Sequence, residues 1–207
     1  MDGLKTDRAG ALRGPSEAGR LLPAGVSVRR PFLPPAEMMR VLRALDALSN
    51  SWAPSQEMGL LGRGVTLQVR PGGCVVTSSL DTIRNTLAGP VLHWVRACGF
   101  AVPAKPFLAI FPVRMLGDPH TPTYQEPHTD SYAGIPHPPV CTSVFYARVR
   151  DMQGGDFAVA DLDDAELRSP HFITPSTNAL VTIPGERVHW VEPITAGERN
   201  CVVLNYF

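Results

Sequence analysis

Three residues, His128, Asp130 and His189, carry the side chains of a metal site. His128 and Asp130 are separated by one residue, and His189 follows after a β-rich stretch. Two imidazoles and one carboxylate occupy one face of an octahedral metal and leave three positions open, which is typical of non-haem Fe(II). Arg199 lies ten residues beyond His189, and its guanidinium indicates an anion held close to the metal. The spacing therefore predicts an iron site with an anionic second ligand.

The segments around these residues have the pattern of buried β-strands. The expected strands are 107–111, 140–147, 179–183, 187–191 and 200–206, with turns at Gly185-Glu186 and Ala196-Gly197. Side chains alternate between the two faces of a strand, so Arg199 is expected to share a face with Cys201, Val203 and Asn205. If that face and the face carrying His189 line one pocket, the metal and the guanidinium lie side by side.

A series of motifs between Tyr124 and the C-terminus, about two-fifths of the chain, occurs in a recognisable order. The motifs are His128-Thr-Asp130, Thr142-Ser-Val-Phe-Tyr146, Gly154-Gly155-Asp156, the block 183–193, Gly197-Glu-Arg199 and Asn205-Tyr-Phe207. In this order they resemble the 2-oxoglutarate- and Fe(II)-dependent dioxygenase superfamily, specifically its prolyl-hydroxylase-like branch. The resemblance implies a mainly β fold with flanking helices, in which a double-stranded β-helix (a jelly-roll or cupin-like barrel) holds the metal at its open mouth.

The resemblance also implies a role for each metal ligand. His128, Asp130 and His189 match the iron ligands, and no catalytic residue is implied beyond them. The implied cofactors are Fe(II), 2-oxoglutarate as co-substrate, and O2. Halogenating relatives lack the carboxylate that Asp130 supplies, so a halogenase is disfavoured.

The co-substrate is expected to be held by three further residues. Arg199 matches the partner of the distal carboxylate of 2-oxoglutarate, which a planar guanidinium can meet with two parallel hydrogen bonds. Many relatives use a lysine there, but neither Lys5 nor Lys105 is at the matching place. Thr142 and Tyr124 match positions that lend a hydroxyl to the same carboxylate, although Tyr124 stands four residues before His128 where the family pattern has three.

The function implied is hydroxylation of an unactivated carbon of a small molecule, with release of succinate and CO2. An amino acid, a short peptide or a natural-product intermediate fits this description. The alternatives are a protein prolyl or aspartyl hydroxylase, a desaturase or cyclase on the same scaffold, and a cupin-like metal-binding protein without redox chemistry. Arg199 discriminates against the last, because a passive metal binder has no need of a guanidinium at that place.

Polar, irregular segments flank the metal pair at 116–127 and 131–139, and a third spans 162–176. Loops at the mouth of such a barrel select the substrate. Tyr132, His137 and Arg114 are the residues expected to contact it.

Composition predicts one domain, residues 23–207, after a mobile N-terminal arm of residues 1–22. Nineteen basic and nineteen acidic residues give a formal net charge of zero, which argues against nucleic acid or an anionic membrane as partner. The sequence has no apolar run as long as a membrane span and no signal-peptide core, so a cytoplasmic location is predicted. The oligomeric state stays open.

Two helices are expected on the outside of the barrel. One begins near Leu33-Pro-Pro35 and places Met38, Val41, Leu42, Leu45 and Leu48 on one face. The other begins at Ser78 and ends at Gly99, with a break or a kink expected at Gly89-Pro90.

Overall fold

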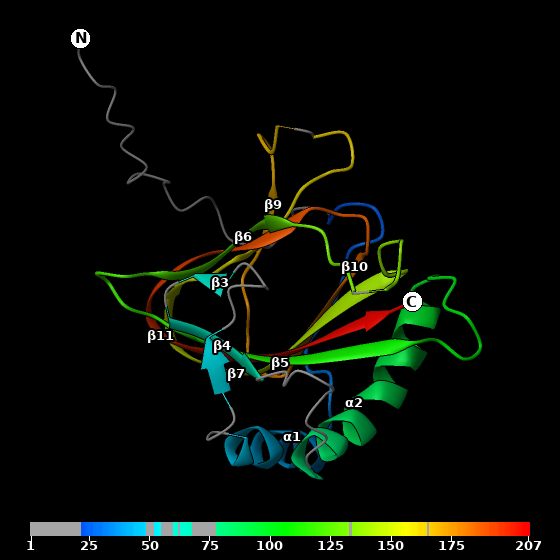
Figure 1. Cartoon of the computed structure of the whole chain (residues 1–207), viewed down its shortest axis with the longest axis horizontal. Helices are drawn as coiled ribbons and strands as arrows, with labels where there is room; N and C mark the ends of the chain where they lie inside the picture. The colour runs from blue at the N-terminus through cyan, green and yellow to red at the C-terminus, as the bar shows by residue number, and fades with distance from the viewer. Residues whose placement is uncertain are drawn as a thin grey trace.

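An antiparallel sheet curls on itself into a barrel, and two helices pack together on its outer side (Figure 1). The computed structural model describes residues 22–48, 78–132, 134–164 and 166–207, and the backbone of three short strands between residues 52 and 67. The predicted N-terminal arm lies outside these residues except for Leu22. The prediction of a double-stranded β-helix with flanking helices is confirmed.

Two helices and eleven strands make up the described part of the chain. Their bounds are β1 Ser27–Arg29, α1 Pro35–Ala47, β2 Trp52–Pro54, β3 Leu60–Leu61, β4 Arg63–Leu67, α2 Ser78–Ala97, β5 Leu108–Leu116, β6 Thr123–His128, β7 Cys141–Gly154, β8 Phe157–Val159, β9 His171–Ile173, β10 Ala179–Pro184 and β11 His189–Tyr206. The main path through the sheet is β1-β10-β7-β11-β5-β4-β2. Strand β11 also pairs with β6 and β8, which pair with β3 and β9 in turn.

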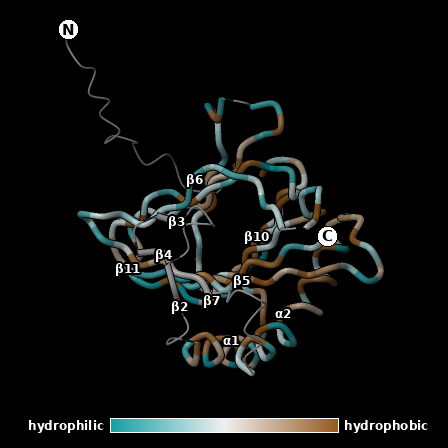
Figure 2. The backbone as a smooth tube through the Cα atoms, viewed as in Figure 1, coloured by the Kyte–Doolittle hydropathy of each residue, from teal (hydrophilic) through white to brown (hydrophobic). Residues whose placement is uncertain are grey.

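The two helices bury their apolar faces against one side of the sheet. Met38, Val41 and Leu45 of α1 are buried there as predicted, together with Leu87 and Val91 of α2. Figure 2 shows the hydrophobic stretches of both helices lying against the lower side of the barrel. Neither helix has the length and apolar character that a membrane span requires, as far as the described residues go.

The sequence predicts a break or a kink of the second helix at Pro90, and the structure shows no break. α2 runs from Ser78 to Ala97 with Pro90 inside it. A proline inside a helix removes one hydrogen bond and costs about 3 kcal/mol. Leu87 and Val91 are fully buried on either side of the proline. We attribute the continuity of α2 to this packing, which offsets the local cost.

Alternation along β11 separates the outside of the barrel from the inside. Val202 and Leu204 belong to the apolar cluster formed with the helices. Cys201 and Val203 face the other way and line an internal cavity. Arg199 and Asn205 have the same parity as Cys201, so they also face the interior, as the sequence predicts.

Strand β11 spans 18 residues and belongs to both walls of the barrel. Its first part pairs with β6 and β8, and its last part with β5 and β7. Register shifts between Ile194 and Glu198 mark bulges. Gly197 there has φ +78°, and a Cβ on it would lie 2.3 Å from the carbonyl oxygen of Arg150. The predicted turn at Ala196-Gly197 is therefore wrong: the chain bends inside a continuous strand, because bulges let the hydrogen-bonded ladder continue through the bend.

The segment that leads into α1 is held by Asn178, just before β10. The side chain of Asn178 accepts a hydrogen bond from Leu33 N at 2.9 Å and donates one to Leu33 O at 2.8 Å. Its backbone has φ +61°, a region that asparagine tolerates better than most residues.

We expect Asn178→Ala to lower the free energy of unfolding by about 2–4 kcal/mol, because it removes two hydrogen bonds and strains a left-handed backbone. Asn178→Gly is the matched control, since it loses the same hydrogen bonds without the strain and should cost about 1 kcal/mol less. Denaturant titration measures both. If Asn178→Ala lowered the free energy of unfolding by less than about 1 kcal/mol, the stabilising role of the Asn178 side chain would be contradicted.

Candidate metal centre

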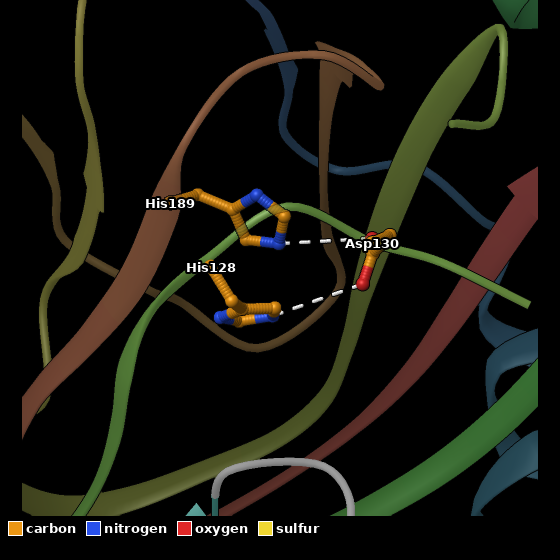
Figure 3. Close-up of side chains that lie close together, drawn as sticks. All are labelled: His128, Asp130 and His189. Atoms are coloured by element: carbon orange, nitrogen blue, oxygen red, sulfur yellow. Dashed lines mark ion pairs between the residues drawn. The ribbon is translucent and has the colours of Figure 1, made fainter. Parts of the chain in front are cut away.

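The three predicted metal ligands come together in space. His128 is the last residue of β6, Asp130 lies in the loop after it, and His189 is the first residue of β11. Their ligand atoms all lie within 4.8 Å of one another. Figure 3 shows the Nε2 atom of each imidazole directed at the Asp130 carboxylate, at 3.7 Å for His128 and 3.6 Å for His189. The cluster has the shape of a three-residue metal site.

A β-bulge positions the two histidines. His128 pairs directly with His189, whereas the next pair in register joins Gln125 to Val191. Three positions on β6 thus oppose two on β11. Without the extra residue, Gln125 and His128 would point to opposite faces; with it, both line the cavity.

Both imidazoles are oriented by backbone carbonyls. His128 Nδ1 lies 2.7 Å from the carbonyl oxygen of Glu126, and His189 Nδ1 lies 3.0 Å from that of Arg187. A carbonyl only accepts, so Nδ1 of each ring carries the proton and donates it. The lone pair is then on Nε2, the atom that faces Asp130. Burial lowers the pKa of His189, which favours the neutral ring that binds metals.

Asp130 is oriented by Thr142, the second residue of β7. Thr142 Oγ1 donates a hydrogen bond of 2.6 Å to Asp130 Oδ2. The sequence assigned this hydroxyl to the co-substrate, but the structure places it on the carboxylate. The register explains the difference: Thr142 lies opposite Asn205, six residues along β11 from Arg199. Thr142 therefore fixes the carboxylate of the candidate ligand set.

The residues present fit a divalent iron ion. Two unprotonated nitrogens and one carboxylate oxygen converge. Each of the three ligand residues is also held by a hydrogen bond to a group that is not itself a ligand. Such outer partners are usual in metal sites, where they fix ring orientation and tautomer. The donor set is that of the iron(II) facial triad.

The cluster lines a small cavity. Its lining residues are Val113, Met115, Gln125, His128, Asp130, Val144, Phe157, His189, Arg199, Cys201 and Val203. Arg199 brings a guanidinium that is only 3% exposed. The predicted metal ligands and the predicted anion-binding arginine thus share one cavity.

The Arg199 guanidinium is poorly compensated by the protein. Its contacts are a 3.4 Å hydrogen bond to the carbonyl oxygen of Gly155 and a 4.0 Å contact to Cys201 Sγ. Its Nε has no hydrogen-bond partner among the described residues. A buried cation without a carboxylate is costly. The arrangement suits an anion that enters the cavity.

Tyr146 of β7 is a residue that the sequence reasoning missed. Arg199 Cζ lies 5.0 Å from the centre of its ring, and its buried hydroxyl has no partner within the described part of the chain. Burial raises the pKa of Tyr146, so the hydroxyl stays protonated and can donate a hydrogen bond. Tyr146 lies opposite Cys201 on β11, which places it on the interior face. Tyr146 lies four residues after Thr142 on the same strand, and this even spacing, which predicts that both side chains face the interior, was the available signal.

Two other predicted residues lie elsewhere. Tyr124 does not line the cavity, whereas its neighbour Gln125 does. Arg114 stands between Val113 and Met115, which both line the cavity, so it belongs to the opposite face. There Arg114 forms an ion pair with Glu198 at 3.2 Å. Neither residue lines the cavity in this structure.

Tyr132 and His137 do come together, around Phe207. The ring centres of Tyr132 and Phe207 lie 6.1 Å apart, and those of His137 and Phe207 lie 6.2 Å apart. Phe107 and Phe111 join Tyr132 at 5.0 and 6.4 Å. The sequence pointed to two members of this group and missed the three phenylalanines.

Comparison with known proteins places the fold. No protein-family model and no curated protein matches the sequence. Among solved structures, a 2OG-Fe(II) oxygenase from Burkholderia pseudomallei matches with a TM-score of 0.67 at 18% identity, over 88% of this chain and 84% of that one. A Pseudomonas putida prolyl-4-hydroxylase matches with a TM-score of 0.63 at 15% identity, over 88% and 91%.

The chain has the 2OG-Fe(II) oxygenase fold.

The epimerase SnoN from nogalamycin biosynthesis, described as non-haem and α-ketoglutarate-dependent, also has this fold. It matches with a TM-score of 0.63 at 14% identity, over 88% of this chain and 76% of that one. The 2OG-Fe(II) oxygenase fold is thus shared by proteins whose described activities differ. The substrate must be argued from the residues of this chain.

Proposed function

We propose that this protein is an Fe(II)- and 2-oxoglutarate-dependent oxygenase that hydroxylates an unactivated carbon of a small molecule, with release of succinate and CO2. One observation carries the proposal. A His-Asp-His cluster, in which both Nε2 atoms face the Asp130 carboxylate, lines the same cavity as a buried guanidinium that has no anionic partner among the described residues.

Each residue of the cavity has a task in this proposal. His128, Asp130 and His189 would hold the iron. Arg199 and the Tyr146 hydroxyl would hold the distal carboxylate of 2-oxoglutarate, which supplies the negative charge that Arg199 lacks. When bound, the iron and the 2-oxo acid supply the oxidation of the substrate carbon by O2.

The apolar wall of the cavity supports the same proposal. Val113, Met115, Val144 and Val203 line the cavity beside the polar groups. Arg199 is buried against this apolar wall, where its interaction with a carboxylate is stronger than it would be in water.

Anaerobic titration of the metal-free protein with Fe(II) and then 2-oxoglutarate tests the proposal directly. We expect a visible iron-to-keto-acid charge-transfer band that saturates at one equivalent of each. Succinate, which lacks the keto group, is the matched control and should give no band. A folded protein that binds Fe(II) but gives no band with 2-oxoglutarate would contradict the proposal and favour a passive metal binder.

A further inference from the structure

Asn205 carries a polar atom that the protein does not satisfy. Its side chain is 2% exposed, and its Oδ1 has no hydrogen-bond partner among the described residues. A buried amide oxygen without a donor costs about 1–3 kcal/mol, and such groups are rare in native structures. Asn205 is therefore a position where a donor is missing.

The register places Asn205 beside the metal centre. It shares the interior face of β11 with Val203, which lines the cavity. Its direct neighbour on β7 is Thr142, whose hydroxyl holds Asp130. The unsatisfied amide thus lies next to the residue that orients a candidate metal ligand, on the side of the cavity away from Arg199.

Beyond Asn205, four rings form an aromatic cluster, which we define as Phe107, Phe111, Tyr132 and Phe207. Phe111 lies opposite Val203, and Phe207 N donates a hydrogen bond to Phe107 O, so these rings continue the interior face towards its open end. The ring centres of Phe107 and Phe207 lie 5.9 Å apart. Phe107 is 47% exposed and Tyr132 is 38% exposed, although both are large apolar groups.

The interior face of β11 carries Arg199 and Val203, which line the cavity with the metal cluster, and then Asn205. The aromatic cluster continues this face beyond Asn205, and we call this end, where Phe107 and Tyr132 are partly exposed, the mouth. Arg199 and the metal ligands are used by the proposed co-substrate and metal. The proposed function uses neither the Asn205 amide, whose Oδ1 has no hydrogen-bond partner among the described residues, nor the aromatic cluster.

We infer that the mouth binds a substrate in which a planar apolar group is joined to an N–H or O–H donor, with the ring against the aromatic cluster and the donor on Asn205 Oδ1. The inference rests on the proposed function and names the substrate class for that site. Aromatic groups stack favourably with offset or tilted rings at 4.5–7 Å. A site that hydrogen-bonds a donor rejects analogues that lack it, because its own polar group is then left unpaired.

Three small amides separate the two features. N-Benzylacetamide has the ring and the N–H, N-benzyl-N-methylacetamide has the ring alone, and N-butylacetamide has the N–H alone. Binding is measured by saturation-transfer NMR on the full chain loaded with 2-oxoglutarate and Zn(II), a metal without redox chemistry. We expect N-benzylacetamide to bind the wild-type protein about tenfold more tightly than either analogue.

Two variants assign the preferences to residues. Asn205→Ala should abolish the discrimination between the N–H and N-methyl amides and keep the preference for the ring. Phe107→Ala should reduce the preference for the ring and keep that for the N–H. Phe172→Ala is the matched control, because Phe172 is 43% exposed and lies on β9, away from the aromatic cluster. Asn205→Leu repeats the first test with the side-chain volume kept.

Several results would overturn the inference. They are equal binding of the three amides to the wild-type protein, absence of binding by all three, or unchanged discrimination in both Asn205 variants. The comparison of the three amides on the wild-type protein needs no variant, so the inference can be contradicted even if a variant folds poorly. The charge-transfer band needs no substrate: a normal band with failed amide binding would remove the substrate class alone, whereas a missing band would remove the proposed function.

Discussion

His189→Ala is expected to weaken Fe(II) binding by more than about 100-fold and to abolish the charge-transfer band with 2-oxoglutarate. The variant removes one of the three ligands outright, and even the loss of an outer hydrogen-bond partner costs about 10–100-fold in metal affinity. The ring is 3% exposed and its Nδ1 proton is held by a carbonyl, so its Nε2 is fixed in the direction of Asp130. Anaerobic Fe(II) titration measures the affinity.

His93→Ala is the matched control, because His93 is exposed on α2, on the far side of the sheet from the cavity. It should bind Fe(II) like the wild-type protein. Circular dichroism must show that the His189 variant keeps its fold. A folded His189 variant with wild-type Fe(II) affinity and an intact band would remove His189 from the ligand set.

Arg199→Ala is expected to weaken 2-oxoglutarate binding by about 100-fold or more while Fe(II) binding stays intact. Truncating one partner of a buried, hydrogen-bonded charge pair costs about 2–5 kcal/mol, and 2.8 kcal/mol corresponds to about 100-fold. The metal ligands do not contact Arg199, so their geometry does not depend on it. Titration of the band with 2-oxoglutarate at saturating Fe(II) gives the affinity.

Three further variants locate the effect. Arg199→Lys keeps the charge and should lose less affinity than alanine, since a lysine makes a point contact in place of a fork. Tyr146→Phe removes one hydroxyl and should cost about tenfold. Arg150→Ala, at a side chain that is 66% exposed, should have no effect. Unchanged affinity in Arg199→Ala would show that the carboxylate is held elsewhere.

The metal ligands and the fold could be predicted from the sequence because their signals are local. One residue separates His128 from Asp130. The periodicities of strands and helices can be read from short segments of sequence. The outward face of β11 and the buried stripe of α1 followed from alternation and helical spacing alone.

Partnerships across strands could not be predicted in the same way. Thr142 bonds Asp130, and Tyr146 packs on Arg199, because of a register between β7 and β11 that joins residues far apart in the sequence. A shift of one residue would exchange these partners. Bulges add to the difficulty, because the extra residue between Gln125 and His128 places Gln125, and not Tyr124, on the face that lines the cavity.

The continuity of β11 has a consequence for the length of the acid that the cavity accepts. In the proposed assignment a single run of backbone carries one metal ligand, the carboxylate partner and the substrate contact, with no flexible joint between them. The strand then fixes the spacing between Arg199 and the metal ligands. In that assignment a shorter or longer 2-oxo diacid cannot bind Arg199 and the iron together. A one-residue insertion between Ile194 and Glu198 would turn Arg199 and Asn205 to the outside at once.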